Sequence, residues 1–450
     1  MIIKLGRYWP RLAVWVLALC LLAPMVIWAS ITLDRSGPIG QQQPIDPSAL
    51  RPGYGPKTFE EALQRADSRL AVKRECVLYF PSDWLYLEGL SHALLSRARL
   101  VGDTRDLVEA DQVLAHAIAI SPWPAGPALS RASEALYLHK LDLSQSALRR
   151  LYASVMTPEI EDLDEARSME CEIAFQRGRL SEAANLCAVG DNLGIRLRRA
   201  NLYAKQGQTA RAMAQIDTVL RAKKYSPSTL SAIELQRASV ALARGDWQAS
   251  GRWVRAANRA FPGSWLTESY LAQQFALEGN LEEARKRYEV LAMQTGNPDV
   301  MDGLTRVLEA KGLVPVASHW RDAATRVWQL RVAALPEAYS THYAEHMLAY
   351  GDPVRALALA EREYARRPFS TTIVNYARAL NRNGMPDKAL NVLQDGFKAG
   401  FYTPAMLSAE SVSFSDLGRP FEARIAMFSA KLLNPKIEDP RQKLVVFDQD

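Results

Sequence analysis

Residues 238–262 read ASVALARGDWQASGRWVRAANRAFP, and residues 344–368 read AEHMLAYGDPVRALALAEREYARRP. Both stretches carry the same phrase: a small residue, a glycine seven positions later, a small residue five positions after that, and a proline after another twelve. Residues 411–435, SVSFSDLGRPFEARIAMFSAKLLNP, repeat the phrase a third time. A phrase that recurs at fixed spacing indicates that one structural unit recurs along the chain. The sequence therefore predicts a repeat protein.

The glycines of this phrase set the length of the repeating unit. They are separated by 29, 38, 34, 33, 39, 33 and 34 residues, at Gly178, Gly207, Gly245, Gly279, Gly312, Gly351, Gly384 and Gly418. A period near 34 residues is typical of helix-turn-helix units. Glycine ends the first helix of such a unit because it adopts the left-handed conformation without strain. The separations of 29, 38 and 39 predict local changes in loop or helix length.

Small residues mark the positions where the two helices of each unit cross closely. They occur in the first helix at Ala200, Ala238, Ala272, Ala344 and Ala377, and in the second at Ala183, Ala212, Ala284, Ala317, Ala356, Ala389 and Ala423. Small side chains let helix axes approach to about 8 to 10 Å. Four positions depart from alanine: Cys171, Ser250, Thr305 and Ser411.

These features resemble the tetratricopeptide repeat (TPR) family, from about residue 80 to residue 435 and most strongly after Glu161. The resemblance implies an all-α, right-handed superhelical solenoid of about nine to eleven helical hairpins. The pattern along the chain divides it into a cytoplasmic N-terminus (1–11), a transmembrane anchor (12–33), a Pro/Gly/Gln-rich linker (34–57), degenerate helical repeats (58–160), TPR-like repeats (161–435) and a charged C-terminal tail (436–450), which we expect to be loose.

The segment 12–33 holds 22 residues without a charge, which is long enough for a helix to cross a bilayer core of roughly 30 Å. Basic residues precede it and Asp34 follows it, so the N-terminus is predicted to lie in the cytoplasm. We predict an uncleaved, single-pass anchor in the cytoplasmic (inner) membrane, with the solenoid in the periplasm or outside. A cleaved signal peptide is the alternative, but its apolar core is usually only roughly 7 to 15 residues long.

The net charge of +6 does not indicate nucleic-acid binding. Three of the basic residues, Lys4, Arg7 and Arg11, precede the anchor, and without them 52 basic residues stand against 49 acidic ones. A nearly neutral solenoid lacks the basic stripe that phosphate backbones require. We therefore expect protein partners, from the membrane or the cell envelope, and no nucleic acid.

Three cysteines follow the anchor: Cys76, Cys171 and Cys187. The last two fall at facing points of two antiparallel helices joined near Gly178. In an oxidising compartment they are candidates for a disulfide, and two buried thiols are the alternative.

The resemblance also implies where partners bind. First helices of such repeats line a concave groove, and the residues just after each crossing position, with those one turn further on, point into it. These are Asn201, Lys205, Gln273, Arg306, Glu345, Arg378, Asn381 and Arg382. Arg378, Asn381 and Arg382 form a cationic patch suited to an acidic peptide or an acidic glycan, and a merely solvated surface is the alternative.

One motif points to catalysis. His342, Glu345 and His346 fit the H-x-x-E-H pattern of zinc peptidases, but the repeat phrase already assigns this stretch to a first helix, and no third ligand lies near. No G-x-S-x-G elbow and no phosphate-binding G-x-x-x-x-G-K-[ST] loop occurs. We therefore expect a scaffold or adaptor of an envelope complex, without enzymatic activity, cofactor or metal. The alternatives are a component of polysaccharide synthesis or export and, more remotely, a zinc hydrolase.

Overall fold

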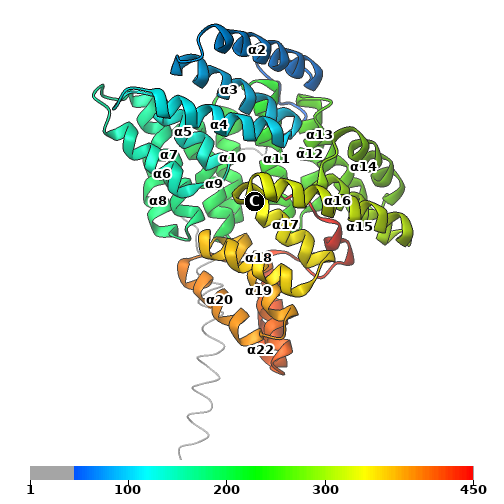
Figure 1. Ribbon diagram of the computed structural model, residues 1–450. Helices are drawn as coiled ribbons and strands as arrows, with labels where there is room; N and C mark the ends of the chain where they lie inside the picture. Colours follow the sequence, from blue (N-terminus) through cyan, green and yellow to red (C-terminus); the bar gives the residue numbers. More distant parts are fainter. Residues whose placement is uncertain (1–44, 449–450) are drawn as a thin grey trace, which may run out of the picture. The chain divides into compact units, whose positions relative to one another are not determined.

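The computed structural model describes residues 45–448, and within this range it contains 21 α-helices, one short 3-10 helix and no strand (Figure 1). Residues from Pro47 onward form one compact unit. The helices are α2 (Phe59–Tyr79), α3 (Trp84–Val101), α4 (Thr104–Ile120), α5 (Ala128–Tyr137), α6 (Leu141–Tyr152), α7 (Ile160–Gln176), α8 (Leu180–Ala188), α9 (Leu193–Lys205), α10 (Thr209–Ala222), α11 (Pro227–Ala243), α12 (Trp247–Ala260), α13 (Trp265–Leu277), α14 (Leu281–Thr295), α15 (Pro298–Ala310), α16 (Val314–Ala334), α17 (Pro336–Tyr350), α18 (Pro353–Arg366), α19 (Ser370–Arg382), α20 (Pro386–Ala399), α21 (Pro404–Asp416), α22 (Pro420–Leu433) and η1 (Pro440–Leu444).

After α2, these helices pair into ten consecutive hairpins, from α3 and α4 to α21 and α22. The predicted solenoid of helix-turn-helix units is therefore confirmed, and so is its resemblance to TPR architecture. The predicted anchor, residues 12–33, lies outside the described residues. Between residues 45 and 448, no helix is both long enough and apolar enough to cross a membrane.

The small residues at the helix crossings are buried, as the repeat phrase requires. Ala238 and Ala272 in the first helices, and Ala212 and Ala284 in the second helices, have no exposed surface. A side chain longer than a methyl group at these positions would push the helix axes apart. The close approach of the two helices in each hairpin therefore depends on these alanines.

Seven of the eight predicted turn glycines adopt the left-handed conformation, with φ between 69° and 89°. The prediction was wrong at Gly351, where φ is −98°. Here α18 begins at once: Asp352 accepts a hydrogen bond from the backbone N–H of Arg355 (2.9 Å), and Pro353 occupies the first turn. The backbone at Gly351, where α17 ends, is therefore extended instead of left-handed.

Two of the three irregular glycine separations come from helix length. α8 has only 9 residues, which accounts for the short separation of 29. α16 has 21 residues, which accounts for the long separation of 39.

Hairpins that lie far apart in the sequence also pack on one another. Phe175 at the end of α7 contacts Phe369 (ring centroids 5.9 Å apart) and Phe401 (5.8 Å), which flank α19 and α20. The backbone N–H of Tyr402 donates to the carbonyl of Lys205 (2.8 Å). One apolar cluster therefore joins α7 and α8 to α19, α20 and α21.

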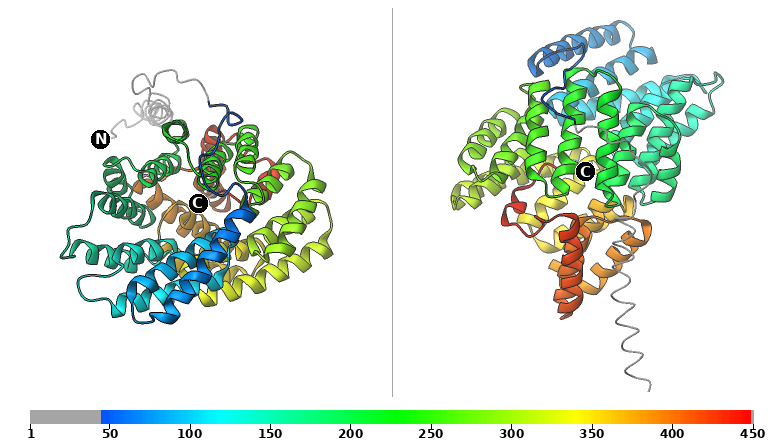
Figure 2. Two further views of the ribbon diagram at one scale, coloured as in Figure 1. Left: turned by 90° about the horizontal axis from the view of Figure 1, so that it is seen from above. Right: turned by 180° about the vertical axis from the view of Figure 1, so that it is seen from behind.

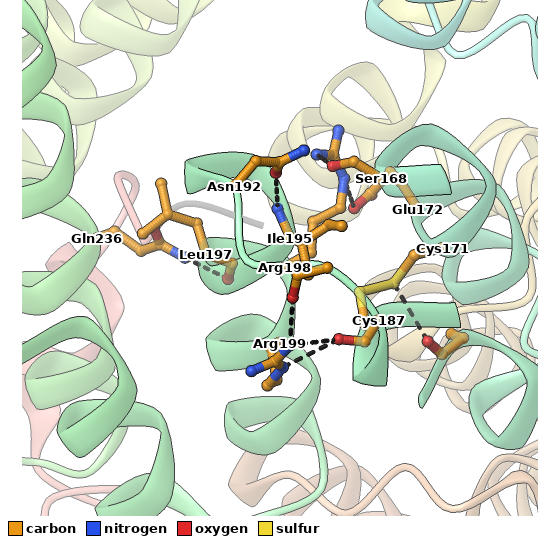
Figure 3. Close-up of a disulfide and its surroundings, with 12 residues drawn as sticks. Ser168, Cys171, Glu172, Cys187, Asn192, Ile195, Leu197, Arg198, Arg199 and Gln236 are labelled. Atoms are coloured by element: carbon orange, nitrogen blue, oxygen red, sulfur yellow. Dashed lines mark hydrogen bonds and ion pairs between the residues drawn. A yellow bond between two sulfur atoms is a disulfide. The ribbon is translucent and has the colours of Figure 1, made fainter. Parts of the chain in front are cut away.

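A disulfide links Cys171 of α7 to Cys187 of α8, with a Cα–Cα distance of 5.7 Å (Figure 3). Both cysteines belong to this apolar cluster and are fully buried. Arg199 of α9 donates two hydrogen bonds to the carbonyl of Cys187 (3.0 and 2.7 Å), so the bridge is tied to the next hairpin as well. Among the described cysteines, Cys76 is free.

Enlarging a crossing alanine should destabilise the solenoid. We expect Ala238→Leu to lower the free energy of unfolding by about 1–3 kcal/mol, because the added methylenes have no space between α11 and α12. Ala232→Leu is the matched control, since Ala232 lies on the same helix but is exposed. Urea denaturation of both variants measures the difference, and equal stabilities would contradict the assignment of Ala238 to a helix crossing.

Replacing the bridge should also destabilise the protein. The cysteines are 16 residues apart, and a closed loop of about this size is worth ~3 kcal/mol of unfolding free energy. We expect this loss in Cys171→Ser with Cys187→Ser, and less than ~0.5 kcal/mol in the control Cys76→Ser. If Cys171 and Cys187 both react with a thiol reagent in denatured, unreduced protein, the bridge does not form.

Candidate partner-binding groove

The tail was predicted to be loose, and for residues 436–448 this was wrong. We call these residues the tail segment. It turns back after α22 and lies against α13 and α15 (Figure 2). The turn is made by Asn434, whose side-chain oxygen accepts a hydrogen bond from the backbone N–H of Lys436 (2.8 Å). Sequence composition did not reveal this, because the contacts are made by the backbone of the segment and by a few side chains, among them Arg441 and Phe447.

The turn at Asn434 fits against the glycine turn between α11 and α12. Gly245 has a φ of 79°, and a Cβ atom there would lie 2.3 Å from the side-chain oxygen of Asn434. A residue with a side chain would be strained at this positive φ and would also clash with Asn434. Gly245 therefore serves twice, once to end α11 and once to admit the returning chain.

Gln273, one of the predicted groove residues, binds the backbone of the tail segment. Its Oε1 accepts hydrogen bonds from the N–H groups of Val446 (2.6 Å) and Phe447 (2.8 Å), and its Nε2 donates to the carbonyl of Phe447 (2.7 Å). The side chain is only 2% exposed, so these three bonds satisfy a polar group that water does not reach. Because the bonds go to main-chain atoms, Gln273 recognises an extended chain independently of its side chains.

Arg306 of α15, a second predicted groove residue, makes the same kind of contact. Its Nη1 donates to the carbonyls of Lys443 (3.1 Å) and Val445 (2.5 Å). Bonds from a guanidinium are charge-assisted and stronger than those between neutral groups. Gln273 and Arg306 were both predicted to line the groove, and in the structure both form hydrogen bonds with the tail segment.

An aromatic pocket holds Phe447 next to Gln273. Its ring lies 5.7 Å from that of Tyr270 of α13 and is stacked at 6.4 Å on that of Tyr288 of α14. Gly303 of α15 makes room for Tyr288, since a Cβ there would lie 2.8 Å from the tyrosine ring. Burial raises the pKa of the Tyr288 phenol above its usual range. The ring of Phe447 is therefore enclosed between two aromatic side chains.

Arg441 anchors the start of the tail segment. It donates to the carbonyl of Leu277 (3.0 Å), where α13 ends, and its guanidinium lies 4.9 Å from the ring of Trp247. Asp439 accepts two hydrogen bonds from the same guanidinium (3.0 and 2.9 Å), which hold the pKa of that carboxyl below its usual range. Sequence analysis missed the aromatic residues of this site. Tyr270 had a usable signal, because it lies one helical turn before Gln273.

A cavity of about 630 Å³ opens beside the tail segment. Its wall combines residues of α13, α14, α15 and α17 with residues of the segment itself: Ala276, Arg306, Glu309, Tyr350, Arg441 and Leu444 are among them. Burial raises the pKa of Tyr350, and the positive charge of Arg306 acts in the opposite direction. The segment thus covers only part of the concave surface, which we call the α13–α15 groove.

The remaining predicted groove residues lie on α9, α17 and α19. Glu345 of α17 accepts a hydrogen bond from Asn375 (2.9 Å), and Asn381 of α19 exchanges hydrogen bonds with Ser413 (2.9 and 3.0 Å). Arg378 and Arg382 are exposed on α19, where Arg382 donates to the carbonyl of Leu348. On α9, Asn201 and Lys205 are half-buried.

The H-x-x-E-H residues are not brought together as metal ligands. His346 is 3% exposed, and both of its ring nitrogens are within 2.8 Å of internal partners, Asp302 and Thr325. His342 is instead stacked on the ring of Trp328 at 5.8 Å. Among residues 45–448, no cluster of three His, Cys, Asp or Glu side chains could hold a metal ion.

Comparisons with known proteins add little beyond the fold. No protein-family model matches the sequence, and no curated protein matches it. Solved structures with similarity include the APC/C hetero-tetramer Cut9–Hcn1 (13% identity over 87% of this chain and 84% of that chain, TM-score 0.35). Yeast Tom70 (13% identity, 85% and 96%, TM-score 0.33) and the TPR domain of P58(IPK) (13% identity, 85% and 99%, TM-score 0.27) are also similar. Because all three TM-scores are below 0.5, these likenesses carry no argument about partners.

Removing the Gln273 side chain should release the tail segment. We expect the backbone amides of Val446 and Phe447 to exchange with deuterium at least roughly tenfold faster in Gln273→Ala, since each lost hydrogen bond is worth about 1 kcal/mol. Gln274→Ala is the matched control: its side chain is also buried but bonds to Trp247 and Glu278. Equal exchange rates in the two variants would contradict the role of Gln273.

Proposed function

We propose that this protein is a scaffold that binds extended segments of partner proteins in the α13–α15 groove. The observation that carries the proposal is the pair Gln273 and Arg306, which together make hydrogen bonds with five main-chain atoms of the tail segment, from Lys443 in η1 to Phe447 beyond it. Recognition through main-chain bonds with one side-chain pocket is a common way for proteins to bind peptides. Repeat solenoids offer long concave surfaces for such binding.

We further propose that the partners are membrane or envelope proteins. Two features support this compartment: the uncharged segment 12–33 and the bridge between Cys171 and Cys187, since disulfides persist mainly in oxidising compartments. In this account the protein is a single-pass protein of the cytoplasmic membrane with its solenoid in the periplasm or outside. An anchored scaffold raises the local concentration of the proteins that it holds, which favours their assembly into a complex.

A second candidate is recognition of an acidic glycan, as a component of polysaccharide synthesis or export. Arg378 and Arg382 favour it, because they lie one helical turn apart on α19 and are exposed. Salt-sensitive binding of a soluble polyuronate that is lost in Arg378→Ala with Arg382→Ala would support this candidate. Absence of binding to the unaltered protein would remove it.

Crosslinking in intact cells tests the scaffold. After detergent extraction and purification of the full-length protein, we expect mass spectrometry to show one or two envelope proteins in near-stoichiometric amounts. The double variant Gln273→Ala with Arg306→Ala should lose them. Gln248→Ala with Arg252→Ala, an exposed pair on α12, is the matched control and should retain them.

Two results would contradict the proposal. Recovery of the protein alone would exclude a stable scaffold. Equal recovery of partners by the groove variant and by the α12 control would show that binding occurs elsewhere on the solenoid.

A further inference from the structure

The tail segment occupies the groove in the manner of a bound peptide. From Lys443 to Phe447 it is held by Gln273 and Arg306 through its backbone, and Val445 is extended (φ −75°, ψ 119°). Only one of its side chains enters an aromatic pocket. Phe447 is 7% exposed there, between Tyr270 and Tyr288. The groove therefore holds the backbone from Lys443 to Phe447 and the ring of Phe447, while Arg441 and the buried Leu444 add contacts earlier in the segment.

Nothing in these contacts requires that the segment belong to the same chain. Bonds to main-chain carbonyls and N–H groups form equally well with any extended peptide, and the aromatic pocket accepts any ring of suitable size. The connection from α22 to η1, residues 434–439, is short, so the segment is presented to the groove at a high effective concentration. A partner peptide with the same chemistry must displace it.

The cavity beside the segment gives a displacing ligand a place to begin. It measures about 630 Å³ and is bounded on one side by Arg441, Lys443 and Leu444 of the segment. On the other side lie Glu309, Ala310 and Ala349, which belong to the solenoid. A longer peptide can contact the solenoid here before the segment leaves.

We propose that the tail segment is an intramolecular ligand of the α13–α15 groove, and that the groove takes extended partner segments bearing an aromatic residue at the position of Phe447. This inference rests on the proposed function. It adds the chemical class of the partner and a form of regulation: the groove is available to partners only in the fraction of molecules whose tail segment has been released, and their apparent affinity is lowered by that fraction.

A labelled peptide tests the inference directly. The probe is a synthetic peptide of residues 440–450, PRQKLVVFDQD, with a fluorophore at its N-terminus, added to the detergent-solubilised full chain. Fluorescence anisotropy should show that the chain carrying Phe447→Ala binds this peptide at least tenfold more tightly than the unaltered chain. Adding Gln273→Ala to Phe447→Ala should abolish binding. A peptide in which the phenylalanine is replaced by alanine should not bind to either chain.

Circular dichroism and thermal unfolding of each variant show that the solenoid remains folded, which separates loss of binding from loss of structure. Equal affinities of the unaltered and Phe447→Ala chains would show that the tail segment does not compete. Failure of the peptide to bind a folded Phe447→Ala chain would show that the groove is not a peptide site.

The failure of this inference can be told apart from failure of the scaffold. If Phe447→Ala does not increase recovery of crosslinked partners, while Gln273→Ala with Arg306→Ala still abolishes it, partners bind in the groove without competition from the tail segment. In that case the proposed scaffold function is retained, and the proposed regulation by the tail segment is rejected.

Discussion

The close crossing of helices through alanine is the constraint on which the whole molecule depends. Ala238, Ala272 and their counterparts hold the two helices of each hairpin together, and this sets the spacing at which successive hairpins stack. The concave surface is a consequence of that stacking. Gln273 on α13 and Arg306 on α15 face the same segment because these are the first helices of two consecutive hairpins.

Contacts between residues far apart in the sequence also stabilise the solenoid. The apolar cluster of Phe175, Phe369 and Phe401 joins hairpins nearly 200 positions apart, and the Cys171–Cys187 bridge lies inside it. Such contacts are unusual for an ideal array, in which each repeat touches only its neighbours. They stabilise the early and late hairpins against each other, and the return of the chain at Asn434 past Gly245 belongs to the same pattern.

The sequence predicted the hairpins well because glycine and alanine act locally. A left-handed turn favours glycine and a close helix crossing admits only small side chains, so single positions are enough to reveal the pattern. Gln273 and Arg306 were chosen from their place after the crossing positions, and both contact the tail segment; their binding of a partner stays a prediction. The tail segment did not follow from composition, because its order depends on surfaces more than 130 residues away, such as Arg306, and on main-chain bonds that leave no sequence signal. The backbone conformation of Gly351 was predicted wrongly, because Asp352 and Pro353 begin α18 directly after it.

Site-specific photocrosslinking in living cells tests the central claim most directly. A photoreactive residue is placed at Glu309, which lines the cavity, or at Gln248, which is exposed on α12 outside it. The account predicts that a distinct partner protein becomes attached at position 309 and not at position 248. Attachment of the same partner at position 248 alone would contradict it, since the partner would then bind the solenoid away from the groove.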